Sequence, residues 1–180
     1  MLFKPMDKVY HQRNSEISAC LKQVFGFVSG RNLGNIVEIA PGYGYGAYAA
    51  ALGFSFEHYF MVDIADTRLA IMKSSGLEKF DKLIFIKQTA AMMPFRENSI
   101  DVVVAVNSLW YGWDSSEYFS CIREGIRVLK HNGFFIMHES AAYEKADELQ
   151  NFFLSNKCSR LRHGKDFKVS SDSRLILMTK

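Results

Sequence analysis

Short apolar runs alternate along the chain with stretches in which apolar residues recur every three or four positions. The runs predict buried β-strands, because they are rich in β-branched and aromatic side chains and end at glycine or polar residues. They cover residues 36–39, 59–62, 83–86, 100–106 and 134–137. The fourth run is apolar on both faces, which is typical of a central strand in a parallel sheet with helices on each side.

The amphipathic stretches predict the helices. They cover residues 15–28, 47–52, 66–73, 114–129 and 142–153. Asn132-Gly133 predicts a turn that leads into the fifth strand. Residues 167–170 and 174–178 predict two further strands, which the turn Ser171-Asp172 joins as an antiparallel hairpin.

This order of elements predicts an α/β fold. We expect an open, mostly parallel, doubly wound sheet of seven strands, with helices on both faces and a C-terminal antiparallel hairpin. A chain of 180 residues is long enough for a sizeable core, and no repeat, linker or low-complexity segment divides it. We therefore expect a single domain over residues 1–180, in which residues 1–30 form an N-terminal helical segment that could act as a lid.

Composition and charge exclude several classes of protein. The chain is 48% hydrophobic and 23% charged, which excludes intrinsic disorder, and its net charge of +3 is too small to indicate a nucleic-acid partner. Cys20, Cys121 and Cys158 form neither a C-x-x-C pair nor a metal-ligand spacing, so we expect no metal and a reducing, cytoplasmic location. We expect no signal peptide and no membrane insertion, because the apolar runs are shorter than the about 18 residues of a membrane span.

A glycine-rich turn follows the first predicted strand. It reads Glu38-Ile39-Ala40-Pro41-Gly42-Tyr43-Gly44-Tyr45-Gly46-Ala47. Glycine tolerates positive φ and lacks Cβ, so such a turn lets the backbone approach a nucleotide closely. The spacing G-x-G-x-x-A, with Asp63 at the end of the second strand, also fits an NAD site. Read alone, the turn leaves NAD(P)-dependent oxidoreductase chemistry open.

Four segments, in order along the chain, resemble the class I (Rossmann-like) S-adenosylmethionine-dependent methyltransferases, in their small-molecule, ubiquinone/menaquinone-biosynthesis-like branch. They are Val37-Glu38-Ile39-Ala40-Pro41-Gly42-Tyr43-Gly44, Met61-Val62-Asp63-Ile64, the stretch 93–103 and Arg127-Val128-Leu129-Lys130-His131-Asn132-Gly133. The resemblance covers about residues 34–140. It implies S-adenosylmethionine as cofactor and transfer of a methyl group to a small-molecule acceptor by in-line displacement.

The resemblance implies cofactor-binding roles at the ends of the first two strands. Glu38 would lie near the cofactor's amino end or organise the loop, and Gly42 and Gly44 would border its methionine portion. Ala40 stands where the family usually has glycine, and we expect it to replace that glycine with an ordinary φ. Asp63 would accept hydrogen bonds from both ribose hydroxyls, although an aspartate there also suits a helix cap.

Four further positions complete the implied cofactor site. Ile64 would pack on the adenine or belong to the core. Thr89 replaces an acid that usually accepts a hydrogen bond from the adenine amino group, so this bond would lack charge assistance. Ala90 would contact the adenine through its backbone, and Asn107, after the fourth strand, would face the same crevice. Thr89 keeps an alternative open, a non-catalytic S-adenosylmethionine-binding or scaffold protein with a degenerate adenine site.

No motif specifies a catalytic residue. Methyl transfer needs a general base only when the nucleophile must lose a proton early. The candidates are His138 and Glu139, just past the fifth strand, and Tyr10 and His11 in the N-terminal segment. An ordinary polar role explains each of these four residues equally well.

Overall fold

The fold is known from a computed structural model of the chain. It describes residues 32–42, 44, 46–47, 50, 53–74, 77–106, 108, 115–139, 142–160, 168–170 and 173–180. The predicted helix over 15–28 lies outside these residues. Of the predicted helix over 47–52, the described residues Ala47 and Ala50 are helical.

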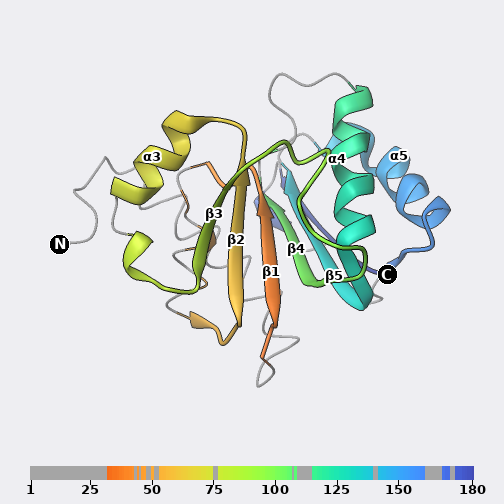
Figure 1. The fold of residues 1–180 in the computed structure, drawn as a ribbon. Helices are drawn as coiled ribbons and strands as arrows, with labels where there is room; N and C mark the ends of the chain where they lie inside the picture. Colours follow the sequence, from red (N-terminus) through yellow and green to blue (C-terminus); the bar gives the residue numbers. More distant parts are fainter. Residues whose placement is uncertain are drawn as a thin grey trace.

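Within the described residues one mixed sheet of eight strands organises the fold (Figure 1). The strands are β1 (Asn35–Ile39), β2 (His58–Asp63), β3 (Leu83–Lys87), β4 (Ile100–Val106), β5 (Leu129–Glu139), β6 (Ser159–Arg160), β7 (Lys168–Ser170) and β8 (Ser173–Thr179). Their order is β3-β2-β1-β4-β5-β8-β6, and β7 pairs with β8. Strands β1 to β5 are mutually parallel, whereas β8 runs antiparallel to β5, β6 and β7. The α/β prediction is confirmed.

The five parallel strands occupy the predicted runs, but the expected count of seven strands is too low. The two-residue strand β6 was not predicted, because two residues carry no periodic signal and β6 exists only through its pairing with β8. Strands β7 and β8 pair in antiparallel register where the hairpin was expected.

Helices cover both faces of the sheet. They are α3 (Asp66–Ser74), α4 (Ser115–Val128) and α5 (Ala142–Ser155), with a short 3₁₀ turn η1 (Leu77–Lys79). Successive strand residues point to opposite faces, so Val37 and Ile39 pack with α4 and α5, whereas Ile36 packs with α3 and η1. Figure 1 shows α3 on the opposite side of the sheet from α4 and α5.

Strand β5 differs from its prediction. The sequence predicted a helix to Leu129 and a turn at Asn132-Gly133, but the strand already begins at Leu129. The turn residues form an irregularity inside the strand: Asn132 has a φ of 65°, and the pairing with β4 shifts between Ile100 and Val102. Asn132 takes the left-handed backbone that asparagine tolerates, but pairing with β4 extends the strand across the position of the predicted turn.

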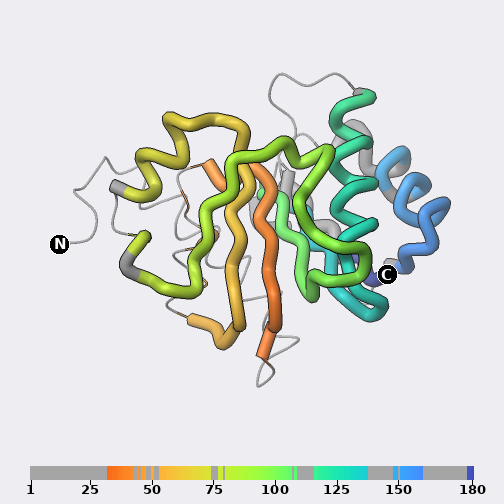
Figure 2. Tube along the Cα trace, in the orientation of Figure 1, coloured from red at the N-terminus to blue at the C-terminus, as the bar shows by residue number. Residues whose placement is uncertain are grey.

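The segment between β3 and β4 is fastened to α4. Figure 2 traces it across the end of the sheet and down beside α4. Glu124 Oε1 accepts a hydrogen bond from the Met93 amide at 2.7 Å, and Arg127 donates to the Phe95 carbonyl at 2.9 Å. Arg127 also forms an ion pair with Glu124 at 2.7 Å. These bonds hold the segment that follows β3 against α4.

Candidate functional site

The parallel strands bring the predicted site residues to one edge of the sheet. Glu38 lies in β1, Asp63 ends β2, and Thr89 follows β3. In an open parallel sheet the crevice beyond the carboxyl ends of the strands is the usual place for a ligand. The edge beyond β1, β2 and β3 is therefore the candidate site.

The turn after β1 takes a left-handed backbone at three of the positions that the structure describes. Ala40 has a φ of 47°, Gly42 of 61° and Gly44 of 79°. The expectation of an ordinary φ at Ala40 is wrong, and the left-handed region costs alanine about 1–2 kcal/mol. The surroundings hold it there: the Ala40 amide donates to the Val62 carbonyl at 2.8 Å, so the turn is bonded directly to β2.

The two described glycines of the motif serve different purposes. A Cβ on Gly42 would meet no atom of the described residues within 4 Å, so no described side chain covers the Gly42 backbone. A Cβ on Gly44 would lie 2.5 Å from Leu77 Cδ1, so Gly44 is needed for packing against η1. Of these two glycines, Gly42 is therefore the one whose backbone a ligand could approach.

Glu38 lies buried beneath this turn. The Tyr59 hydroxyl donates to Glu38 Oε2 at 3.0 Å, and the Ala47 amide donates a second hydrogen bond. A Cβ on Gly46 would stand 2.4 Å from Glu38 Oε1, so the absent side chain of Gly46 makes room for the carboxyl. Burial raises the pKa of Glu38 to about 8, because the interior penalises the charged form. This position favours the loop-organising alternative for Glu38.

Asp63 is the second buried acid of the edge. Its Oδ1 accepts a hydrogen bond from the Ala65 amide at 2.8 Å. Because the Ala65 carbonyl accepts the first hydrogen bonds of α3, this bond closes a turn ahead of the helix and is not the helix cap that the sequence offered as an alternative. Its Oδ2 is buried and has no hydrogen-bond partner among the described residues; Arg68 Nη1 lies 3.7 Å away, beyond hydrogen-bond reach. A buried carboxylate oxygen without a donor is costly, and a ligand hydroxyl would satisfy it.

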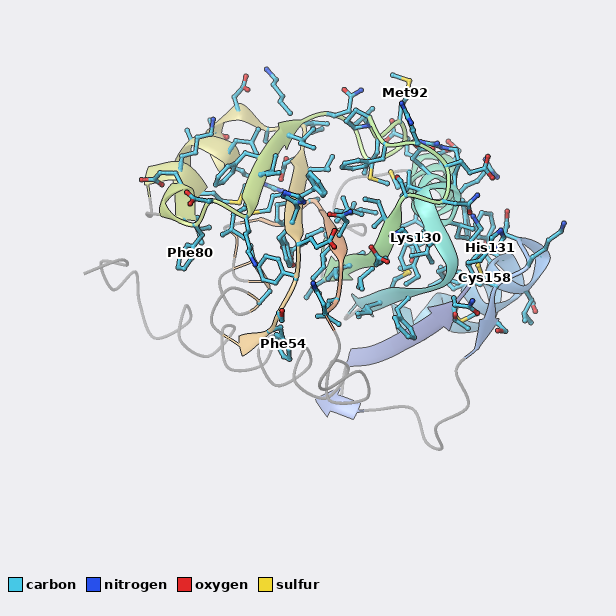
Figure 3. The ribbon with its side chains drawn as sticks, turned by 60° about the horizontal axis from the view of Figure 1, so that its bottom comes forward. Phe54, Phe80, Met92, Lys130, His131 and Cys158 are labelled. Carbon is cyan, nitrogen blue, oxygen red and sulfur yellow. The ribbon has the colours of Figure 1, made fainter. Side chains whose placement is uncertain are left out.

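Two apolar side chains are exposed in the segments that follow β2 and β3. Ile64 is 58% exposed and Met92, which was not predicted as a site residue, is 64% exposed. Ile64 is therefore no core residue, and Figure 3 shows Met92 pointing away from the fold. Thr89 Oγ1 accepts a weak hydrogen bond from the Ala91 amide at 3.3 Å, and Ala90 is buried. The Thr89 hydroxyl is thus partly engaged in its own turn.

Of the four proton-transfer candidates, the structure describes the backbone of His138 and Glu139 but not Tyr10 or His11. His138 pairs with Val106 at the carboxyl end of β5, on the candidate edge, and Glu139 ends that strand. The side chains of both residues lie outside the described part of the chain. So do Tyr10, His11 and Asn107.

The described residues provide no alternative chemical centre. No group of three or more His, Cys, Asp or Glu side chains among them could hold a metal ion. Cys121 and Cys158 are buried, and burial raises the pKa of Cys121 to about 12, so its reactive thiolate is disfavoured. No helix in the described ranges is long and apolar enough to cross a bilayer.

Sequence reasoning missed three residues that shape the edge: Tyr59, Arg68 and Met92. Tyr59 was assigned only to a strand, and its hydroxyl reaches Glu38 because β1 and β2 are neighbours. Arg68 lies in the first turn of α3, five residues after Asp63, and no sequence spacing pointed to its ion pair with the end of β2. Met92 carried no signal, since its exposure depends on the path of the loop.

The chain matches the model of one protein family over residues 38–137, more than half of its length; the family is described as "Methyltransferase domain". A putative S-adenosylmethionine-dependent methyltransferase from Methanococcus maripaludis is 16% identical, with a TM-score of 0.74 and coverage of 97% of this chain and 90% of the other. A second such methyltransferase, from Clostridium acetobutylicum, is 10% identical, with a TM-score of 0.73 and coverage of 92% and 91%.

A third solved structure is a putative methyltransferase of Haloferax volcanii in complex with the methyltransferase activator Trm112. It is 13% identical, with a TM-score of 0.70 and coverage of 93% of both chains. At these identities the structures show a shared fold. No curated protein sequence matches the chain significantly.

Proposed function

Because the chain belongs to the methyltransferase domain family, and its cofactor is S-adenosylmethionine, we propose that it transfers a methyl group to a small-molecule acceptor by in-line displacement. The observation that carries the proposal is the buried Asp63 Oδ2 without a donor, at the edge where parallel strands bind ligands. The family match also decides between the two nucleotides that the glycine turn left open, in favour of S-adenosylmethionine.

The residues of the edge fit this cofactor. Asp63 Oδ2 would accept from ribose hydroxyls, and each such charge-assisted hydrogen bond contributes about 1.5–3 kcal/mol. Ile64 and Met92 offer exposed apolar surface for the adenine. The Gly42 backbone, which no described side chain covers, would lie along the methionine portion. Ala90 and Asn107 remain proposed contacts.

When bound, S-adenosylmethionine supplies a methyl group that its positively charged sulfur already activates. The chain is then required mainly to hold the acceptor in line with that methyl group, and positioning of this kind can lower a barrier by about 7–11 kcal/mol. His138 has a suitable backbone position on β5 for a general base, if the acceptor needs one. Glu139, Tyr10 and His11 remain weaker candidates.

A second candidate function is S-adenosylmethionine binding without catalysis, as a scaffold. Thr89 favours it, because its hydroxyl is partly used by the Ala91 amide and offers adenine no charge-assisted bond. The Haloferax volcanii methyltransferase, which binds an activator protein, suggests a protein partner for either function.

The organisation of the whole chain is part of the proposal. We propose one domain over residues 1–180, with 1–30 as a lid over the edge, a cytoplasmic location and no nucleic-acid partner. Limited proteolysis with and without S-adenosylmethionine tests the lid, because a ligand under it would protect residues 1–30 from cleavage.

Binding is tested by isothermal titration calorimetry with S-adenosylmethionine, and NADH serves as the negative control. We expect saturable heat with the first and none with the second. The variant Asp63→Asn keeps the size and an oxygen for the Ala65 amide but loses the charge, so it should bind far more weakly. A folded protein that gives no heat with S-adenosylmethionine rules the proposal out.

Catalysis is tested separately by release of S-adenosylhomocysteine with a panel of small-molecule acceptors. Release with any acceptor establishes the enzyme and excludes the scaffold. Binding of the cofactor without release across a broad panel, with and without candidate protein partners, favours the scaffold.

A further inference from the structure

The buried carboxyl of Glu38 lies among apolar neighbours. Glu38 shares a sheet face with Ile36, and its register partners are Met61 on β2 and Val104 on β4. All three neighbours are buried and apolar. No Lys, Arg or His side chain in the described ranges forms an ion pair with Glu38. A charge on this carboxyl would therefore lack compensation from a cation.

The hydroxyl of Tyr59 donates a side-chain hydrogen bond to Glu38. It lies opposite Ile36 on the neighbouring strand, so its ring reaches Glu38 diagonally across the sheet. The ring is fully buried and packs edge-to-face against Phe56, with centroids 5.8 Å apart. This packing aims the hydroxyl at Glu38 Oε2, 3.0 Å away.

The position of the carboxyl links it to the ligand edge. It lies under Gly46 and the Ala47 amide, where the glycine turn passes into helix. Among the described side chains, the other buried acid at this edge is Asp63, which forms an ion pair with Arg68, and Lys87 at the end of β3 is paired with Asp66. The turn itself is bonded to β2 through Ala40. Within the described part of the chain, a cation that binds over the turn would therefore be the first positive charge to compensate Glu38.

We propose that Glu38 is protonated in the free protein and releases its proton when the cationic cofactor binds over the turn, with Tyr59 as the positioning residue that stabilises the ionised form. The proposal rests on the proposed function, because it needs a ligand that carries an ammonium and a sulfonium group. No bond other than the O–H of Glu38 breaks, and the proton passes to the buffer.

The direction of the effect follows from charge and burial. Burial holds the pKa of Glu38 at about 8 in the free protein, and a nearby positive charge lowers the pKa of a carboxyl. Cofactor affinity should therefore increase as pH rises toward 8 and then level off. The hydrogen bond from Tyr59 lowers the pKa of Glu38, so its loss should move that midpoint to higher pH.

The number of protons released is measured by calorimetry of S-adenosylmethionine binding in phosphate and in Tris, whose ionisation enthalpies differ. We expect release of most of one proton near pH 7 and none near pH 9.5. Titration with S-adenosylhomocysteine, which keeps the ammonium but not the sulfonium, shows which charge is responsible. Binding without proton release near pH 7 overturns this inference and leaves the proposed function standing, whereas absence of binding overturns the proposed function.

Three variants test whether Glu38 releases the proton and whether Tyr59 stabilises its ionised form. Glu38→Gln should abolish proton release and the pH dependence of affinity. Tyr59→Phe should lower the affinity at pH 7 about tenfold and shift the midpoint upward. Tyr118→Phe, which removes a buried hydroxyl on the other face of the sheet, should leave the proton count unchanged. Unchanged release in Glu38→Gln, or an unshifted midpoint in Tyr59→Phe, contradicts the assignment.

If Tyr59→Phe fails to fold, as judged by circular dichroism, the role of Tyr59 is tested in the unaltered protein. Infrared spectra should then show the carboxylic-acid band of Glu38 disappear on cofactor binding, together with a change in the tyrosine C–O band. A change confined to the carboxyl band contradicts the role of Tyr59.

Discussion

The two ends of the sheet treat their acids differently: the acid at the amino end is half-buried and paired, whereas the two at the carboxyl end are buried. At the amino end, Asp101 of β4 accepts from the Asn35 amide at 2.9 Å and from Lys130 Nζ at 2.9 Å. At the carboxyl end, Asp63 has one oxygen without a donor among the described residues, and Glu38 accepts from the Tyr59 hydroxyl and the Ala47 amide but pairs with no cation there. An acid that is paired with a cation belongs to the scaffold, whereas a buried acid with an open acceptor or no cation can mark the place for a ligand.

The amino end also has a recess, but its acid and its lysine already pair with each other. The residues that line it are Asn32, Leu33, Asp101, Val102, Lys130, His131, Asn132, Gly133 and Phe134. Figure 3 shows Lys130 and His131 well separated from Met92 at the candidate edge. A hollow alone therefore does not identify a site, since the Asp101–Lys130 pair inside it is complete.

The largest expected effect is the pH dependence of stability at Glu38. Its pKa in the folded protein is about 8, raised from 4.5, so the folded state holds a proton that the unfolded state loses as pH rises between these values. The free energy of unfolding should fall by about 1.4 kcal/mol per pH unit in this window, on the order of 4 kcal/mol from pH 5 to 8. Urea denaturation across this range measures it, with Glu38→Gln as the control that removes the slope. An equal slope in both proteins contradicts the assignment.

Asp63→Asn should weaken cofactor binding on the order of 100-fold, because it replaces charge-assisted hydrogen bonds worth about 1.5–3 kcal/mol each. Stability should be unchanged or higher, since the variant removes an incompletely compensated buried charge. Calorimetry and urea denaturation of the same preparation separate the two quantities. Loss of stability without loss of affinity would place Asp63 with the scaffold acids.

Asp101→Ala should show the opposite pattern. It leaves the Asn35 amide without its acceptor and Lys130 without its partner, so unfolding should become easier by about 1–3 kcal/mol, while cofactor affinity stays within twofold. Lys130→Met, which breaks only the exposed ion pair, should lose less than about 1 kcal/mol. A cofactor affinity that falls with Asp101→Ala would break the distinction between the two ends.

The smallest effects concern the turn. Gly44→Ala should cost about 1–3 kcal/mol, because its φ is 79° and its Cβ would strike Leu77. Ala40→Gly should change stability by less than about 1 kcal/mol, since relief of the left-handed backbone is countered by a more flexible unfolded chain. Thermal denaturation measures both. A large stabilisation by Ala40→Gly would show that the turn is more strained than its bond to β2 suggests.

Several features could be predicted because they depend on local pattern. Apolar runs placed the strands β1 to β4 within about two residues, and the carboxylate that ends β2 was chosen as a candidate binding residue, a role that stays a prediction. Other features depend on partners far away in the sequence. The φ of Ala40 follows from its bond to Val62, and the start of β5 follows from pairing with β4.

The sequence by itself determined the α/β architecture, the sheet edge at which the site residues gather and the choice of Asp63, because hydrophobic periodicity and strand ends are local properties. Only the tertiary structure decided which polar atoms are satisfied. It showed that Tyr59 reaches Glu38, that Asp63 keeps one oxygen without a donor and that Thr89 is partly engaged by its own turn. Hydrogen-bond satisfaction and desolvation depend on neighbours brought together by folding, and these set the chemistry of the edge.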